Sequence, residues 1–255
     1  MWIRRELTEP LKKLALHYPV LVLTGPRQVG KTSLLERSCP KAGYVTLDFA
    51  QATEQARTSP AEFLRENPPP VIIDEIQYSP TLLKHLKAVV DKQPDMKGAY
   101  LLTGSQSFPL MQAVSESLAG RVAVVSMLSL GFDEWQAGSE TVPGEDRLSF
   151  LFRGGFPAQW NQPEDPLDRV RWYQSYLATY IERDIRNILN VGSLRDFNRF
   201  IHACAIMNGQ LLNMSDIGRD VGVSATTARK WLSVLQASGT IYLLEPYHSS
   251  MGKGL

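Results

Sequence analysis

Apolar residues in the first half of the chain gather in short, nearly continuous runs separated by amphipathic stretches. Such runs are typical of strands in a parallel sheet that is covered on both faces. We expect strands at residues 19–24, 43–47, 71–73, 99–103 and 122–126. The amphipathic stretches between them predict helices at residues 31–37, 60–65, 81–91 and 110–118. This alternation of strand and helix predicts an α/β sandwich built from βαβ units.

The pattern changes after residue 130. Residues 138–146 form a polar loop or turn, and residues 167–189 predict one long helix rich in aromatic residues. Further helices are expected at 194–207, 216–221 and 226–237, with a glycine-containing turn before the last of them and a strand at 239–244 after it. That order of helices, turn and strand is typical of a winged helix.

These changes divide the chain into four predicted segments. We expect an α/β core at 1–130, a helical lid-like subdomain at 131–192, a winged helix at 193–247 and a short tail at 248–255.

Bulk composition excludes several classes of protein. The 255 residues carry a net charge of +1, which gives no global electrostatic footprint for nucleic acid. The two cysteines lie far apart, which argues against a disulfide framework and a zinc site. No signal peptide and no apolar run of spanning length occurs, so we expect a soluble, cytoplasmic protein without a membrane partner.

The first apolar run leads into a glycine-rich loop, GPRQVGKT, that fits the pattern G-x-x-x-x-G-K-[ST]. Two glycines allow a tight turn, so that backbone N–H groups point inward and cradle phosphate oxygens. The lysine supplies a positive charge to the β- and γ-phosphates, and the threonine hydroxyl ligates Mg²⁺. The sequence therefore predicts an ATP and Mg²⁺ site formed by Gly25, Pro26, Arg27, Gln28, Val29, Gly30, Lys31, Thr32 and Ser33.

A second apolar run, residues 71–73, ends in Asp74 and Glu75. Ligands of open α/β sheets bind beyond the carboxyl ends of the strands, so both carboxylates are expected beside the phosphate loop. We assign Asp74 to the metal and Glu75 to the general base that polarises the attacking water.

Two further assignments have plain structural alternatives. Ser105 or Gln106 follows the apolar run at 99–103 and is a candidate sensor of the γ-phosphate. The alternative is a capped turn in which Ser105 or Ser107 starts the next helix. Arg121 is a candidate arginine finger, acting in cis or from a neighbouring subunit, or else part of a surface salt bridge. A finger in trans would require a homo-oligomer.

Together these residues resemble a known family, the predicted bacterial and archaeal AAA+ P-loop ATPases that continue into a winged helix and a restriction-endonuclease-like domain of unassigned function. The resemblance extends to about Pro246 and is carried by GPRQVGKT (25–32), LDF (47–49), VIIDEIQ (71–77), LLTGSQ (101–106), ESLAGR (116–121), FRGGFP (152–157), YIERDI (180–185) and LLNMSDIGRDVGVS (211–224). It implies a P-loop NTPase sheet of the AAA+ type. Because the nuclease-like domain has no counterpart here, residues 248–255 are expected to be a truncated tail.

Three functions are compatible with this pattern. The first is ATP hydrolysis with Mg²⁺ that drives a conformational change coupled to the winged helix. The second is a nucleotide-gated DNA- or protein-binding switch with little turnover, and the third is a DNA-binding or scaffolding fragment. DNA binding would use Arg229 and Lys230, but residues 193–255 hold six basic against four acidic residues, a net charge of only +2.

Overall fold

The computed structural model describes residues 2–93, 95–105, 108–138, 147–160, 165–181 and 194–245. The chain divides into two compact units, Met1–Tyr173 and Gln174–Leu255, which we describe separately. The tail predicted at 248–255 lies outside the described residues. No helix in the described part of the chain combines the length and the apolar character that a membrane crossing needs.

The first unit is built on a parallel sheet of five strands, and these are the five strands that the sequence predicts. They are β1 (Val20–Gly25), β2 (Gly43–Thr46), β3 (Val71–Asp74), β4 (Tyr100–Ser105) and β5 (Val122–Ser126). Their order in the sheet is β2-β3-β4-β1-β5. The strand β4 therefore lies between β1 and β3, and all three end at the same edge.

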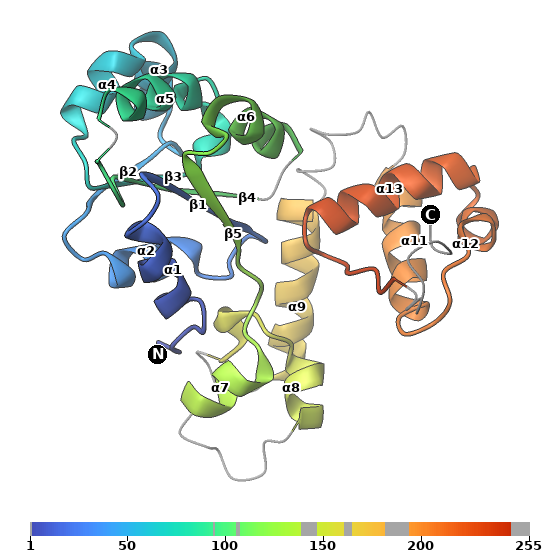
Figure 1. Ribbon diagram of the computed structural model, residues 1–255. Coiled ribbons are helices and arrows are strands. Elements are labelled where there is room, and N and C mark those ends of the chain that lie inside the picture. The colour runs from blue at the N-terminus through green and yellow to red at the C-terminus, as the bar shows by residue number, and fades with distance from the viewer. Residues whose placement is uncertain are drawn as a thin grey trace, which may run out of the picture. The chain divides into compact units, whose positions relative to one another are not determined.

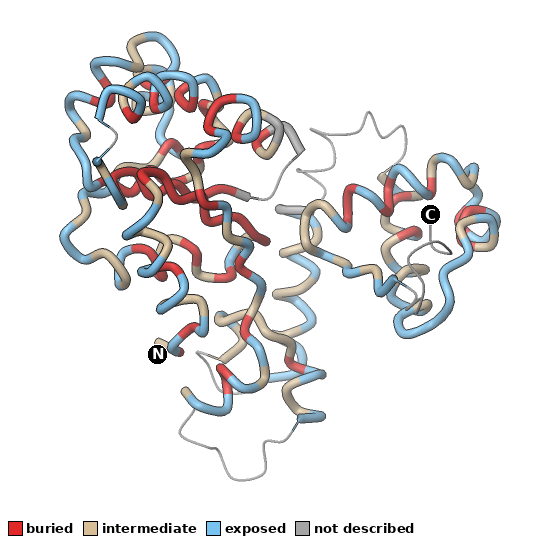
Figure 2. The backbone as a smooth tube through the Cα atoms, viewed as in Figure 1, coloured by how far each residue is buried: buried red, intermediate tan, exposed pale blue. Residues whose placement is uncertain are grey.

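Helices cover both faces of the sheet (Figure 1). One face carries α3 (Ala50–Thr58), α4 (Pro60–Glu66), α5 (Leu82–Lys92) and α6 (Phe108–Leu118), and the other carries α1 (Thr8–Ala15) and α2 (Lys31–Ser38). Successive side chains of a strand point to opposite faces. Accordingly Val20 and Val22 pack into the hydrophobic core under α3, α4, α5 and α6, whereas Leu21 and Leu23 pack into the core under α1 and α2. The central strands are consequently buried almost throughout (Figure 2).

Short helices follow β5 in the first unit. They are α7 (Phe132–Gly138), α8 (Arg147–Arg153), the 3₁₀ turn η2 (Pro157–Trp160) and α9 (Pro166–Tyr176). Four aromatic rings join α7, α8 and η2 by tilted, edge-on and stacked contacts: Phe132, Trp135, Phe150 and Trp160. Of the helix predicted at 167–189, the described residues form α9 and a π-helical turn, Leu177–Ile181, whereas 182–189 lie outside the described residues. The predicted lid-like segment, 131–192, is thus shared between the two units.

Three helices make up the described core of the second unit: α11 (Leu194–Ile206), α12 (Met214–Val221) and α13 (Ala225–Ala237). Their buried residues form one cluster around Phe197, Phe200 and Trp231. The turn between α12 and α13 follows Gly222, which adopts the left-handed conformation with φ of +88°. Arg229 and Lys230 are exposed on α13.

The strand predicted at 239–244 is not observed, and a winged helix is therefore not confirmed. Residues 241–245 have no regular secondary structure. Ile241 and Leu243 still pack on the helical core, while Tyr242 and Leu244 are exposed. Buried and exposed side chains thus alternate as they would in a strand. No second strand of this unit occurs among the described residues, however, to form hydrogen bonds with this segment.

Candidate functional site

The phosphate loop connects the end of β1 to the start of α2. Two of its glycines have left-handed backbones, with φ of +146° at Gly25 and +93° at Gly30, and Gln28 also has a positive φ of +62°. A side chain at Gly25 would collide with the backbone carbonyl of Met127, the residue that follows β5. The loop therefore requires glycine at this position for two separate reasons, its backbone angle and its close approach to a neighbouring chain segment.

Lys31 begins α2 and is almost fully buried, at 7% exposure. Its Nζ donates hydrogen bonds to the carbonyl oxygens of Gly25, at 3.1 Å, and Pro26, at 2.8 Å. The ammonium group is therefore held against the loop that precedes it. A buried ammonium needs oxygen atoms as hydrogen-bond acceptors. Phosphate oxygens are charged and are therefore stronger acceptors than the two carbonyl oxygens.

The carboxylate of Asp74 is the meeting point of three hydroxyl groups. The Thr32 hydroxyl lies 3.0 Å from each of its two oxygens, and the Tyr44 hydroxyl donates to Oδ2 at 3.1 Å. The Thr103 hydroxyl donates to Oδ1. These donors come from α2, β2 and β4, so the end of β3 collects hydroxyls from three elements.

The environment of Asp74 also changes the acidity of Tyr44. Burial raises the pKa of Tyr44 to about 12, and the negative charge of Asp74 and the hydrogen bond to it act in the same direction. Burial disfavours the phenolate because a charged group loses its hydration, and Asp74 disfavours it because a second negative charge would stand beside the first. Tyr44 therefore remains a hydrogen-bond donor to Asp74 throughout the neutral range.

Glu75 follows Asp74 with a left-handed backbone, φ +58° and ψ +44°, which turns its side chain out of the line of the strand. Its N–H donates to the Thr103 hydroxyl at 3.3 Å, and its Oε2 accepts from the Gln77 side chain. Its Oε1 lies 4.0 Å from Nη1 of Arg27. Both side chains of this pair are mostly buried, so the second carboxylate is linked directly to the phosphate loop.

The structure thus brings the loop, Thr32, Asp74 and Glu75 together, as the motifs predict. It also adds Thr103, Tyr44 and Gln77, which the sequence did not single out. Thr103 is fully buried, and a hydroxyl inside the apolar run of β4 was the signal for it. Ser105 is the last residue of β4, whereas Gln106 lies outside the described residues.

Arg121 lies away from this site. It precedes β5, whose register pairs Val20 with Val122, so Arg121 is at the start of β1 and not at its end. The length of β1 separates it from the loop by about 16 Å along the strand. Its guanidinium donates from Nε and Nη2 to Asp91 and from Nη1 to the Ala119 carbonyl. A finger acting in cis, one of the two roles considered for it, does not agree with this position, whereas the salt bridge does.

Comparisons with known proteins agree with this architecture. The model of the AAA domain family matches residues 17–136, and that of a domain of unknown function matches residues 144–255. Uncharacterized proteins of Mycobacterium bovis and Mycobacterium tuberculosis are 32% identical over 251 residues, which cover 98% of this chain and 55% of theirs. The chain therefore spans about half the length of these curated relatives.

Among solved structures, the Walker-type ATPase of Pyrococcus abyssi is similar in fold, with a TM-score of 0.53 and 16% identity. The superposition covers 93% of this chain and 90% of that protein.

Proposed function

We propose that the chain binds ATP with Mg²⁺ and hydrolyses it beside the phosphate loop, in keeping with the match of residues 17–136 to the model of the AAA domain family. The observation that carries the proposal is the direct contact of Thr32 with Asp74, 3.0 Å from both carboxylate oxygens. It joins the element that would hold phosphate to the element that would hold the metal.

The side chains beside the loop fit a magnesium ion. Mg²⁺ takes oxygen ligands and is bound in nucleotide sites by one or two protein groups together with the phosphates. The Thr32 hydroxyl and the Asp74 carboxylate supply oxygens from two different elements that already meet. When bound, the ion neutralises phosphate charge and orients the phosphates.

In this proposal the loop and Lys31 bind the phosphates. Its ammonium group would exchange the carbonyls of Gly25 and Pro26 for phosphate oxygens, which are charged and therefore stronger acceptors. At Gly25 the loop backbone lies against the Met127 carbonyl, in a space that a Cβ would have to share with that oxygen. A loop held in one shape loses little conformational entropy on binding.

Glu75 is the general base of the proposal. Its carboxylate would accept a proton from the attacking water, while the Gln77 side chain holds Oε2 and leaves the orientation of the group defined. Arg27 lies near Oε1 and keeps the carboxylate on the side of the loop. Proton transfer of this kind contributes roughly 10²- to 10⁴-fold to a rate.

The test is phosphate release with ATP and Mg²⁺ over a range of protein concentrations, together with calorimetric ATP binding. We expect Glu75→Gln to bind ATP like the wild type and to release phosphate at least about 100-fold more slowly. Lys31→Ala should lose tight binding. Glu62→Gln, a matched change of an exposed glutamate on α4, should change neither quantity.

Two outcomes would refute parts of the proposal. If Glu75→Gln releases phosphate as fast as the wild type, Glu75 is not the base. If the wild type and Glu75→Gln both bind ATP tightly and neither releases phosphate, the chain is a nucleotide-gated switch and not a hydrolase. A rate per subunit that rises with concentration would indicate a site completed between two copies.

A further inference from the structure

Arg5 is buried, at 4% exposure, and its guanidinium bonds groups from three distant parts of the first unit. Nε donates to Glu134 at 2.9 Å, and Nη1 donates to the carbonyl of Val29, within the phosphate loop, at 2.9 Å. Nη2 donates to the carbonyls of Leu128 and Ser129, at 2.8 and 3.1 Å. One side chain near the N-terminus thus connects the loop to the segment that follows β5.

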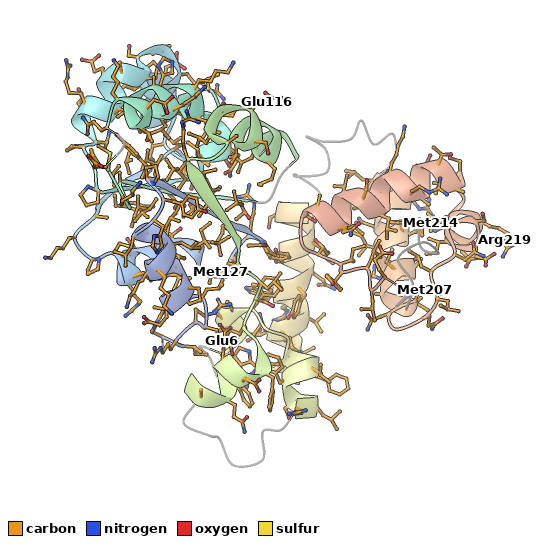
Figure 3. All side chains as sticks on the ribbon, viewed as in Figure 1. Glu6, Glu116, Met127, Met207, Met214 and Arg219 are labelled. Atoms are coloured by element: carbon orange, nitrogen blue, oxygen red, sulfur yellow. The ribbon has the colours of Figure 1, made fainter. Side chains whose placement is uncertain are left out.

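Glu134 balances the buried charge of Arg5 and is itself fully engaged. Its Oε1 accepts from the backbone N–H of Glu6 at 2.7 Å, and its Oε2 also accepts from that of Gly131 at 3.0 Å. Figure 3 labels Glu6, in the N-terminal segment that this carboxylate ties to α7. An ion pair with every oxygen bonded is the form in which charges persist inside a protein.

The segment that Arg5 holds is also the support of the phosphate loop. Met127, labelled in Figure 3, donates its N–H to the Thr24 carbonyl at 2.8 Å, and its own carbonyl lies where a side chain on Gly25 would be. Three residues later, the N–H of Leu130 donates to the carbonyl of Gly155 at 2.7 Å. The phosphate loop is therefore fixed at Gly25 by one part of this segment and at Val29 by Arg5.

Val29 is where the loop most needs such a bond. It stands between Gln28 and Gly30, both with positive φ, and a non-glycine residue in that region is strained. Strained backbone persists only where the surroundings hold it. The guanidinium supplies this constraint because its donors are arranged in a rigid fork that reaches four acceptors at once, which an ammonium group does not do.

We infer that Arg5 is a positioning residue of the ATP site, which sets the shape of the phosphate loop through the Val29 carbonyl. The inference rests on the proposed function of that loop. It places the N-terminal segment, outside the glycine-rich motif, among the determinants of nucleotide affinity.

The test uses Arg5→Lys in the full chain, which keeps a positive charge for Glu134 but removes the fork. We expect the KM for ATP and the calorimetric Kd to rise about tenfold, the effect of one lost charge-assisted hydrogen bond. The kcat should stay within about twofold, because bound ATP restores the loop. A purely structural role would lower the active fraction, and hence the apparent kcat, and leave KM unchanged. Arg65→Lys, a matched change in an exposed ion pair on α4, should leave KM and Kd unchanged.

A second variant covers the case in which Arg5→Lys does not fold. Arg5→Met combined with Glu134→Gln removes both charges, which buried sites tolerate better than the loss of one partner, and leaves one side-chain oxygen to accept from the amide of Glu6 or of Gly131. It too should bind ATP about tenfold more weakly. If the wild type binds ATP and whichever variant folds binds it equally well, Arg5 is not a positioning residue, whereas a wild type that does not bind ATP removes the proposed function itself.

Discussion

Thr32 and Asp74 are 42 residues apart in sequence, and the hydroxyl of one lies 3.0 Å from both carboxylate oxygens of the other. The strand order explains how this contact is made. β1, which leads into the loop of Thr32, and β3, which ends at Asp74, are both neighbours of β4 and end at the same edge. Thr103 on β4 fills the space between them and donates to the same carboxylate.

Thr103→Val should weaken the site without disturbing its shape, because the two side chains are nearly isosteric. The change removes a donor to Asp74 and an acceptor for the Glu75 N–H, both in a buried environment. We expect a loss of stability of about 1–3 kcal/mol in urea unfolding and a reduction of turnover of about tenfold. Thr58→Val, on the exposed end of α3, is the control. Wild-type turnover in Thr103→Val would mean that this hydroxyl does not support the carboxylates.

Tyr44 should make the stability of the protein fall in alkaline solution. Its pKa is raised to about 12 in the folded chain, from an ordinary value of 10. A raised pKa means that the folded state holds its proton more tightly, so the contribution is fully present below pH 10 and is lost as the pH rises toward 12. The effect is small, because the side chain is half exposed.

Urea unfolding of the wild type and of Tyr44→Phe between pH 10 and about 12, the window of that shift, measures it. The free energy of unfolding should decrease more steeply with pH in the wild type than in the variant. Parallel curves would show that the phenol of Tyr44 titrates alike in the folded and unfolded chain.

Arg121→Ala should have little effect on a single copy of the chain. Its partner Asp91 and Arg121 itself are each more than a third exposed, and pairs of this kind contribute about 0–1 kcal/mol. Turnover of dilute protein should therefore equal that of the wild type. A loss of turnover that appears only at high protein concentration would instead assign Arg121 to the site of a neighbouring copy.

The sequence predicted the sheet well, because strands buried on both faces leave a plain apolar signature. Among the helices that cover the sheet, two were missed, α1 and α3. α3 buries a single residue, Ala56, and so shows no wide apolar stripe. α1 has only 8 residues, of which Leu11 alone is fully buried, so its apolar stripe is short. The strand predicted at 239–244 is not observed for another reason. Alternation of apolar and polar residues predicts which side chains are buried, but not whether a partner strand is present.

Within the site, local motifs identified the residues that follow a strand or form the loop. They did not identify Thr103, Tyr44 or Arg5, whose roles depend on which elements become neighbours. Arg5 contacts Glu134, which lies 129 residues away in sequence, and the residues next to Arg5 in the sequence do not predict a buried ion pair. Contacts of this kind follow from topology and are visible only in the folded structure.

Gly25→Ala tests the closest approach in the phosphate loop. The added methyl group would meet the Met127 carbonyl, and the φ of +146° is unfavourable for any residue with a side chain. The loop must therefore shift away from the segment after β5, which should cost more than about 1 kcal/mol of stability. Because the loop is then no longer held in its binding shape, ATP affinity should fall at least about tenfold.

Gly43→Ala is the matched control for this change. Gly43 begins β2 without a positive φ, and an added methyl group would lie 3.8 Å from Val71, an ordinary contact distance. The free energy of unfolding of Gly43→Ala should stay within about 0.5 kcal/mol of the wild-type value, and its ATP affinity should be unchanged. Calorimetry and urea unfolding on both variants give the comparison. If Gly25→Ala binds ATP as tightly as Gly43→Ala, then the contact with Met127 does not fix the phosphate loop, and the support attributed to the segment after β5 is wrong.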